Sequence, residues 1–151
     1  MGFNYWAWVA TDWAIDNYSI KTGISLGRQV IHIHDCDKQG EELQKLELTK
    51  YLTPTGSAKP YADEAYFIHK GIDLHSLDYS DYEGASFIAD LSQDPSTNDP
   101  IIAHAERYDS VFDIGTSEHV GNPFASIANA FNLLRPGGYY FYDLPCSGWT
   151  N

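Results

Sequence analysis

Basic residues, cysteines and long apolar runs are all scarce in this sequence. Its 151 residues include 9 lysines and arginines against 21 aspartates and glutamates, so the formal net charge is −12. A field of that sign repels phosphate backbones, and we therefore expect no broad nucleic-acid interface. Two cysteines, Cys36 and Cys146, are too few for a disulfide framework, which favours reduced thiols and a cytoplasmic protein. The N-terminus has neither the basic segment nor the long apolar stretch of a signal peptide or membrane span, so we expect no membrane contact.

Apolar side chains are plentiful by contrast. Hydrophobic residues make up 43% of the chain, aromatic residues 15% and charged residues 20%, which fits a globular protein and not a disordered one. The length predicts a single domain over 1–151, with a helical and aromatic N-terminal segment at 1–20 and an α/β core at 21–151.

Hydrophobic spacing predicts alternating helices and strands along the first half of the chain. Trp6, Val9 and Trp13 recur at helical spacing and predict a short amphipathic helix. The segments that follow are expected as a strand at 21–27, an extended stretch at 28–35, a helix at 36–52, a loop at 53–64, a helix end at 65–71 and a strand at 72–80.

The second half continues this alternation. A strand is expected at 85–92, a loop at 93–100 and a strand at Ser110–Ile114. Asn122 before Pro123 is the N-cap and first-turn signal of a helix that we expect to end at Pro136. One face of this helix carries Phe124, Ile127, Ala128, Phe131 and Leu134. The last expected strand spans 139–144.

Strands that alternate with helices predict an α/β protein with βαβ units. We expect a Rossmann-like, mainly parallel sheet of about five strands, with helices on both faces because the crossovers are right-handed. Ligands of such sheets bind at the carboxyl ends of the strands, near the point where the strand order reverses.

Glycine or acidic residues follow four successive predicted strands. Gly27 ends the first strand, Asp78 the second and Asp90 the third, and Gly115 to Glu118 follow the fourth. A glycine lets the backbone approach a ligand closely, and a carboxylate after the next strand can accept both ribose hydroxyls. Each residue alone is equally at home in an ordinary turn, so only their succession indicates a nucleoside-binding crevice.

The stretch "YDSVFDIGTSEHVGNPFASIANAFNLLRPGGYYFYDLP" resembles the second half of a class I S-adenosylmethionine-dependent methyltransferase. The residues that carry the resemblance are Phe112-Asp113, Glu118-His119-Val120 and Leu134-Arg135-Pro136-Gly137-Gly138. The resemblance implies S-adenosylmethionine as the cofactor, with Asp78 on the ribose and Asp90-Leu91 beside the adenine. Gly27, Gly115 and Glu118 would complete that cofactor site.

The chain departs from the family in two respects. Its first loop has a single glycine, Gly27, no acidic residue in the preceding strand, and an apparent insertion before Asp78. The antiparallel hairpin that normally follows the fifth strand is lacking, as in a minimal or truncated member. Three functions stay open: a methyltransferase with an unknown small-molecule or protein acceptor, an inactive methyltransferase-like domain that binds the cofactor or a protein partner, and another Rossmann-like nucleotide binder.

His119 is the candidate general base by its position, and a histidine that is hydrogen-bonded locally is the alternative. His32 and His34 alternate in an extended stretch, but a metal site needs more ligands, so we expect no metal. The tryptophans near the N-terminus are expected in the core, as a lid over the crevice or as a partner site.

The aromatic strand at 139–144 is expected to form an open sheet edge. Such edges tend to pair with another chain or to be covered. The expectations are a homodimer through this edge, coverage by the tail "CSGWTN", or coverage by the aromatic N-terminus.

Overall fold

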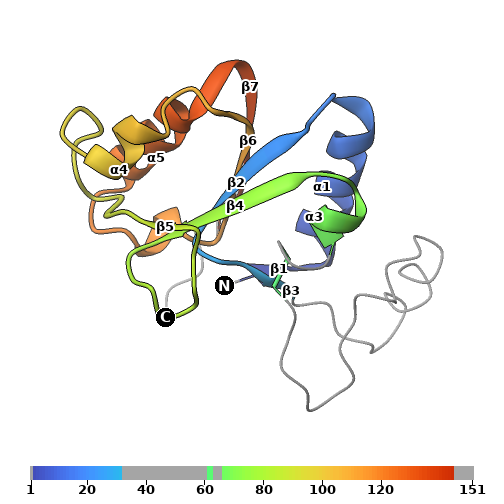
Figure 1. Ribbon diagram of the computed structural model, residues 1–151. Helices are drawn as coiled ribbons and strands as arrows, with labels where there is room; N and C mark the ends of the chain where they lie inside the picture. The colour runs from blue at the N-terminus through green and yellow to red at the C-terminus, as the bar shows by residue number, and fades with distance from the viewer. Residues whose placement is uncertain (1, 32–60, 63–65, 145–151) are drawn as a thin grey trace.

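The centre of the protein is a five-stranded sheet in which every pairing is parallel. The computed structural model describes residues 2–31, 61–62 and 66–144. The strand order is β5-β4-β2-β6-β7 (Figure 1). The strands are β2 (Thr22–Leu26), β4 (Asp73–Asp78), β5 (Phe87–Ile88), β6 (Tyr108–Ile114) and β7 (Leu134–Asp143). The predicted Rossmann-like α/β fold is therefore confirmed.

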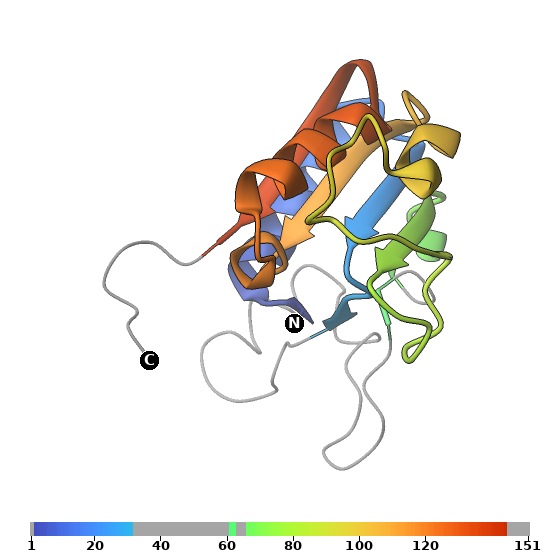
Figure 2. The same ribbon diagram turned by 90° about the vertical axis from the view of Figure 1, so that its left-hand side faces the viewer.

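Helices cover both faces of this sheet, as the right-handed crossovers predict. On one face lie α1 (Tyr5–Asn17) and α3 (Tyr66–His69); on the other lie α4 (Asp99–Ala103) and α5 (Pro123–Leu133), as Figure 2 shows from the side. A small parallel pair, β1 (Gly2–Phe3) with β3 (Val30–Ile31), lies outside the main sheet. A short 3-10 turn, η2 (Ser117–His119), follows β6.

Each face of the sheet has its own apolar core. The α1/α3 side is built around Phe3, Trp8, Phe67 and Phe112, whose rings pack at tilted and edge-on angles. The α4/α5 side is aliphatic and includes Ile24, Leu26, Leu77, Ile101, Val111 and Leu133. Strand β6 is buried along its whole length, as expected for a central strand of a parallel sheet.

Several predicted boundaries are wrong, among them the start of the last strand, which is expected at 139 and lies at Leu134. The strand expected at 85–92 covers only Phe87–Ile88. The loop expected at 93–100 ends earlier, because α4 begins at Asp99 with Asn98 as its N-cap and Pro100 in its first turn. Helix α5 ends at Leu133 and not at Pro136, because the chain joins β7 at once. The residues between Leu134 and Tyr139 then form an irregularity opposite the single residue Asp109.

The helical faces predicted from aromatic spacing are also wrong. On α5 the exposed residues include Phe124 and Phe131, at 83% and 58% exposure. The buried residues are Ala125, Ser126, Asn129, Ala130 and Leu133. On α1, Trp6 and Trp13 are exposed, whereas Ala7, Trp8, Thr11 and Ala14 are buried. In α5 small side chains let the helix approach the sheet closely, so the large rings of its opposite face turn outwards. In α1 Trp8 fills the core between small residues, and Trp6 and Trp13 lie on the exposed side.

Several predictions lie outside the described residues. These are the helix at 36–52, most of the loop at 53–64, the residues His32, His34, Cys36 and Cys146, and the tail at 146–151. Among the helices that the structure describes, none has the length and apolar character needed to cross a membrane.

Candidate functional site

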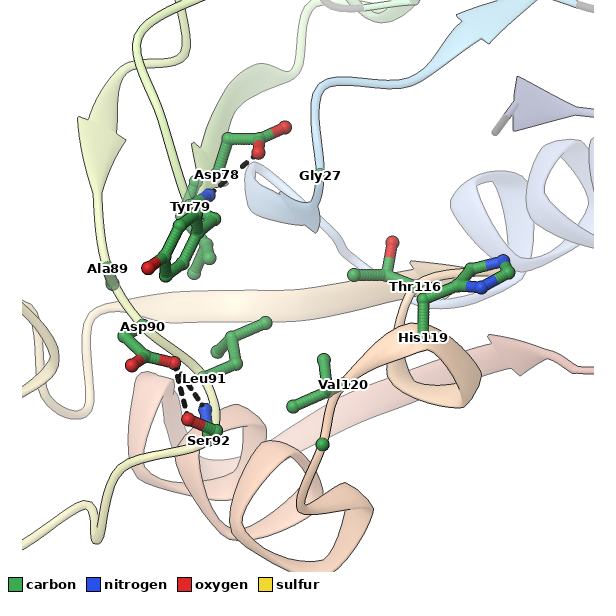
Figure 3. Close-up of a pocket in the computed structure, with 12 residues that line it drawn as sticks. Gly27, Asp78, Tyr79, Ala89, Asp90, Leu91, Ser92, Thr116, His119 and Val120 are labelled. Atoms are coloured by element: carbon green, nitrogen blue, oxygen red, sulfur yellow. Dashed lines mark hydrogen bonds between the residues drawn. The ribbon is translucent and has the colours of Figure 1, made fainter.

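A cavity of about 400 Å³ opens at the carboxyl ends of the strands. The loops after β2, β4, β5 and β6 line it, with Gly27, Leu77, Asp78, Tyr79, Ala89, Asp90, Leu91, Ser92, Thr116, His119, Val120 and Gly121 (Figure 3). From β2 the chain moves outwards through β4 to β5 and then returns to β6 on the other side of β2. The cavity therefore lies at the switch in strand order, where open parallel sheets bind ligands.

Gly27 brings the backbone of the first loop against the neighbouring strand. Its φ of 72° lies in the left-handed region that favours glycine. Its amide donates to the carbonyl of Leu77 at 2.7 Å, which extends the pairing of β2 with β4 by one turn residue. The absence of a side chain keeps this side of the cavity open to a ligand.

Asp78 ends β4 and is oriented by two backbone amides. Its carboxylate accepts hydrogen bonds from the amide of Tyr79 at 2.7 Å and from that of Arg28 at 3.3 Å. The carboxylate therefore lies beside the turn at Gly27 (Figure 3). Each oxygen retains acceptor capacity, since a carboxylate offers about four lone-pair sites.

Asp90 and Ser92 form a tight turn on the opposite side of the cavity. The amide and the hydroxyl of Ser92 both donate to the Asp90 carboxylate, at 2.9 and 2.6 Å. These bonds lower the pKa of Asp90 below its ordinary value. The turn presents the buried side chain of Leu91 as an apolar wall.

Two buried asparagines hold this turn against α5. Asn129 of α5 donates to the carbonyls of Leu91 and Gln93, at 3.1 and 2.9 Å. Asn98 donates to the carbonyl of Asp90 at 2.9 Å and to the side-chain oxygen of Asn129 at 3.3 Å. Buried amides that are paired in this way fix the loop after β5 in one position.

The far wall of the cavity is positioned by Asp113, a fully buried carboxylate of β6. One of its oxygens accepts from the amides of Thr116 and Ser117, at 3.2 and 3.1 Å. The other accepts from the hydroxyl of Tyr140 on β7 at 2.7 Å. Burial, together with this bond to the carboxylate, raises the pKa of Tyr140 well above its usual range. The site therefore depends on a network that reaches the last strand.

His119 lies at the rim of the cavity. Its side chain is 68% exposed, and the nearest carboxylate oxygen, from Glu118, is 3.7 Å from its Nε2. Figure 3 shows its ring turned away from Leu91 and Val120. Glu118 and Gly115 flank this loop but do not line the cavity; Gly115 makes the turn after β6 with a φ of 77°.

The cavity presents hydrogen-bond acceptors and lacks fixed positive charge. Among its described lining residues are two carboxylates and neither lysine nor arginine. The nearest cation in sequence, Arg28, donates to the carbonyl of Glu83 and lies 4.0 Å from the ring of Tyr61. Among the described lining residues a diphosphate would find no countercharge, whereas their acceptors suit an uncharged or cationic ligand.

Gln29 adds an unpaired acceptor beside the far wall. Its amide nitrogen donates to the carbonyl of Leu26 at 2.7 Å and to the hydroxyl of Thr116 at 3.3 Å. Its side-chain oxygen is buried and has no hydrogen-bond partner in the part of the chain that the structure describes. Gln29 does not itself line the cavity, but its amide nitrogen bonds the lining residue Thr116 and so helps to hold this wall.

The structure brings together most of the predicted site residues and adds others. Gly27, Asp78, Asp90, Leu91 and His119 all line one cavity. The lining residues that sequence reasoning missed include Tyr79, Ser92 and Val120. Ser92 could have been predicted from the sequence, because a serine two residues after an aspartate favours a turn in which the aspartate side chain accepts from the serine. Nothing in the sequence marks the paired asparagines.

No group of three or more histidine, cysteine or acidic side chains within 2–31, 61–62 and 66–144 is arranged to hold a metal ion. Comparison of the chain with protein-family models, curated proteins and solved structures found no match.

Proposed function

We propose that the protein binds S-adenosylmethionine in the cavity at the carboxyl ends of its strands and transfers the methyl group to an acceptor. The observation that carries the proposal is the position of Asp78, at the end of the strand beside β2, in a cavity at the switch in strand order. A carboxylate in this position suits the two hydroxyls of a ribose.

The residues of the cavity fit the parts of this cofactor. Asp78 would hold the ribose, and Leu91 with Val120 would flank the adenine. Asp90 would lie at the adenine edge, as the resemblance implies. The absence of lysine and arginine from the described lining supports a ligand that carries no phosphate.

The cofactor supplies an already activated methyl group when it is bound, so the chain has mainly to orient the acceptor. His119 at the rim would accept a proton from a hydroxyl or similar acceptor through a ring nitrogen. Its exposed side chain must turn towards the cavity to do so.

Titration calorimetry with S-adenosylmethionine and with its demethylated product tests the proposal. We expect both to bind, and Asp78→Ala to weaken both at least tenfold, because a bidentate bond to the ribose is lost. The matched control is Asp81→Ala, which removes an exposed carboxylate from the same loop. Absence of binding by either compound would overturn the proposal.

Binding without turnover is the second candidate. The exposed position of His119, whose nearest described carboxylate is 3.7 Å away, favours it, because no short hydrogen bond orients this base. Methyl transfer to a panel of small molecules and proteins, followed with a labelled methyl group, separates the two. A titration with NAD tests the third possibility, for which the described lining offers no countercharge.

A further inference from the structure

Strand β7 forms an edge of the main sheet. It pairs with β6 on one side, and no described strand pairs with its other side. Natural edges are protected by charge, proline or a bulge. In β7 the proline and the irregularity lie at Arg135–Gly138, which leaves the aromatic run Tyr139–Tyr142 without such protection.

One flank of this edge is an exposed aromatic stripe on α5. Asn129 points towards Gln93 and the loop before α4, as its hydrogen bonds show. Phe131 is two residues further along, about 200° around the helix, and therefore faces the opposite side. Its ring lies 5.6 Å from that of Tyr140 on β7. Phe124, seven residues earlier, falls on the same stripe.

The other flank is formed by α1 and the residue that follows it. Tyr18 stacks on Tyr139 with ring centroids 4.4 Å apart, and Trp13 packs edge-on against Tyr18 at 5.5 Å. Trp13 is itself exposed. The open edge is thus bordered by aromatic rings on both faces of the sheet. Figure 2 shows α1 and α5 on the two faces of the sheet.

The part of this region formed by α5 and β7 is nearly free of charge in a strongly acidic chain. Between His119 and Asp143 the only ionised side chain is that of Arg135, which lies 2.7 Å from the Asp109 carboxylate. Two copies that each carry a net charge of −12 repel one another over most of their surface. The neutral edge is where such copies approach at the smallest electrostatic cost.

We propose that β7 is the interface of a homodimer, in which two copies pair their β7 strands antiparallel across a two-fold axis. An edge strand is complementary to itself in this arrangement, because each strand donates and accepts the same bonds. The aromatic stripes on α5 and α1 then flank the joined strands on both faces. This inference does not depend on the ligand of the cavity.

Sedimentation velocity at micromolar concentration tests the dimer. We expect the wild-type chain to sediment at about twice its 17.0 kDa mass. Tyr142→Asp, an exposed position of β7, should shift it to the monomer mass because it places a charge without a partner among the aromatic rings of the interface. Ile88→Asp, an exposed position of the opposite edge strand β5, is the matched control and should remain dimeric.

Hydrogen exchange provides a second measurement that does not rely on a variant. Amides of residues 139–142 should exchange more slowly at a concentration where the dimer forms than at one where it dissociates. A wild-type chain that sediments as a monomer overturns the proposal. So does a dimer that Ile88→Asp dissociates and Tyr142→Asp leaves intact.

Discussion

The hydroxyl of Tyr140 donates a 2.7 Å hydrogen bond to the buried carboxylate of Asp113, across the last strand pair of the sheet. Asp113 also receives the amides that shape the far wall of the cavity. Removing the hydroxyl leaves one carboxylate oxygen without this donor in a buried position.

We therefore expect Tyr140→Phe to lower the free energy of unfolding by about 1–3 kcal/mol. Tyr142→Phe, at an exposed position of the same strand, should change it by less than about 0.5 kcal/mol. Urea denaturation at one fixed protein concentration measures both, since self-association alters apparent stability. If Tyr140→Phe and Tyr142→Phe had the same free energy of unfolding, the hydrogen bond from Tyr140 to Asp113 would not stabilise the fold.

The depressed pKa of Asp90 depends on Ser92, so Ser92→Ala should raise it towards the ordinary value of about 3.9. A carboxyl whose pKa is lowered by folding stabilises the protein above its unfolded pKa. That contribution is lost as the pH falls through the folded pKa. The variant should therefore be less stable than wild type at neutral pH and approach it in acid.

An NMR titration of the carboxyl carbons measures this shift directly. Asp94 and Ser96 form an equivalent turn, in which Ser96 lowers the pKa of Asp94. Ser96→Ala is thus the control: it should raise the pKa of Asp94 and leave that of Asp90 in place. The prediction fails if Ser92→Ala leaves the Asp90 titration unchanged.

Asn129 is a buried polar anchor, and Asn129→Ala should destabilise the protein by about 1–3 kcal/mol. The carbonyls of Leu91 and Gln93 lose their donor, and the loop after β5 should become more mobile. Hydrogen exchange in residues 90–94 should rise with the loss of stability. Asn132→Ala, on the exposed side of the same helix, should change stability by less than about 0.5 kcal/mol.

The sequence predicted the parallel sheet and the residues at its strand ends better than it predicted the helix faces. Gly27, Asp78 and Asp90 could be placed because glycine and aspartate mark the ends of strands and the sheet brings those ends together. The faces of α1 and α5 could not, since helical spacing identifies an aromatic stripe but not the side that packs. In α5, Ala125 and Ala130 permit close packing, and Asn129 is buried because its bonds are satisfied.

The central position of β2 has a consequence for how the chain folds. β2 pairs with β4 on one edge and with β6 on the other, where Gly23 lies opposite Ser110. The pairing of β2 with β6 joins segments far apart in sequence. The conformational entropy lost on closing the chain between them must therefore be overcome before the contacts between the two strands stabilise the fold. During synthesis β2 presents a bare edge until β6 has emerged from the ribosome. We expect refolding to be slow for a domain of this size. Aggregation should compete with folding while the edge of β2 is still unpaired.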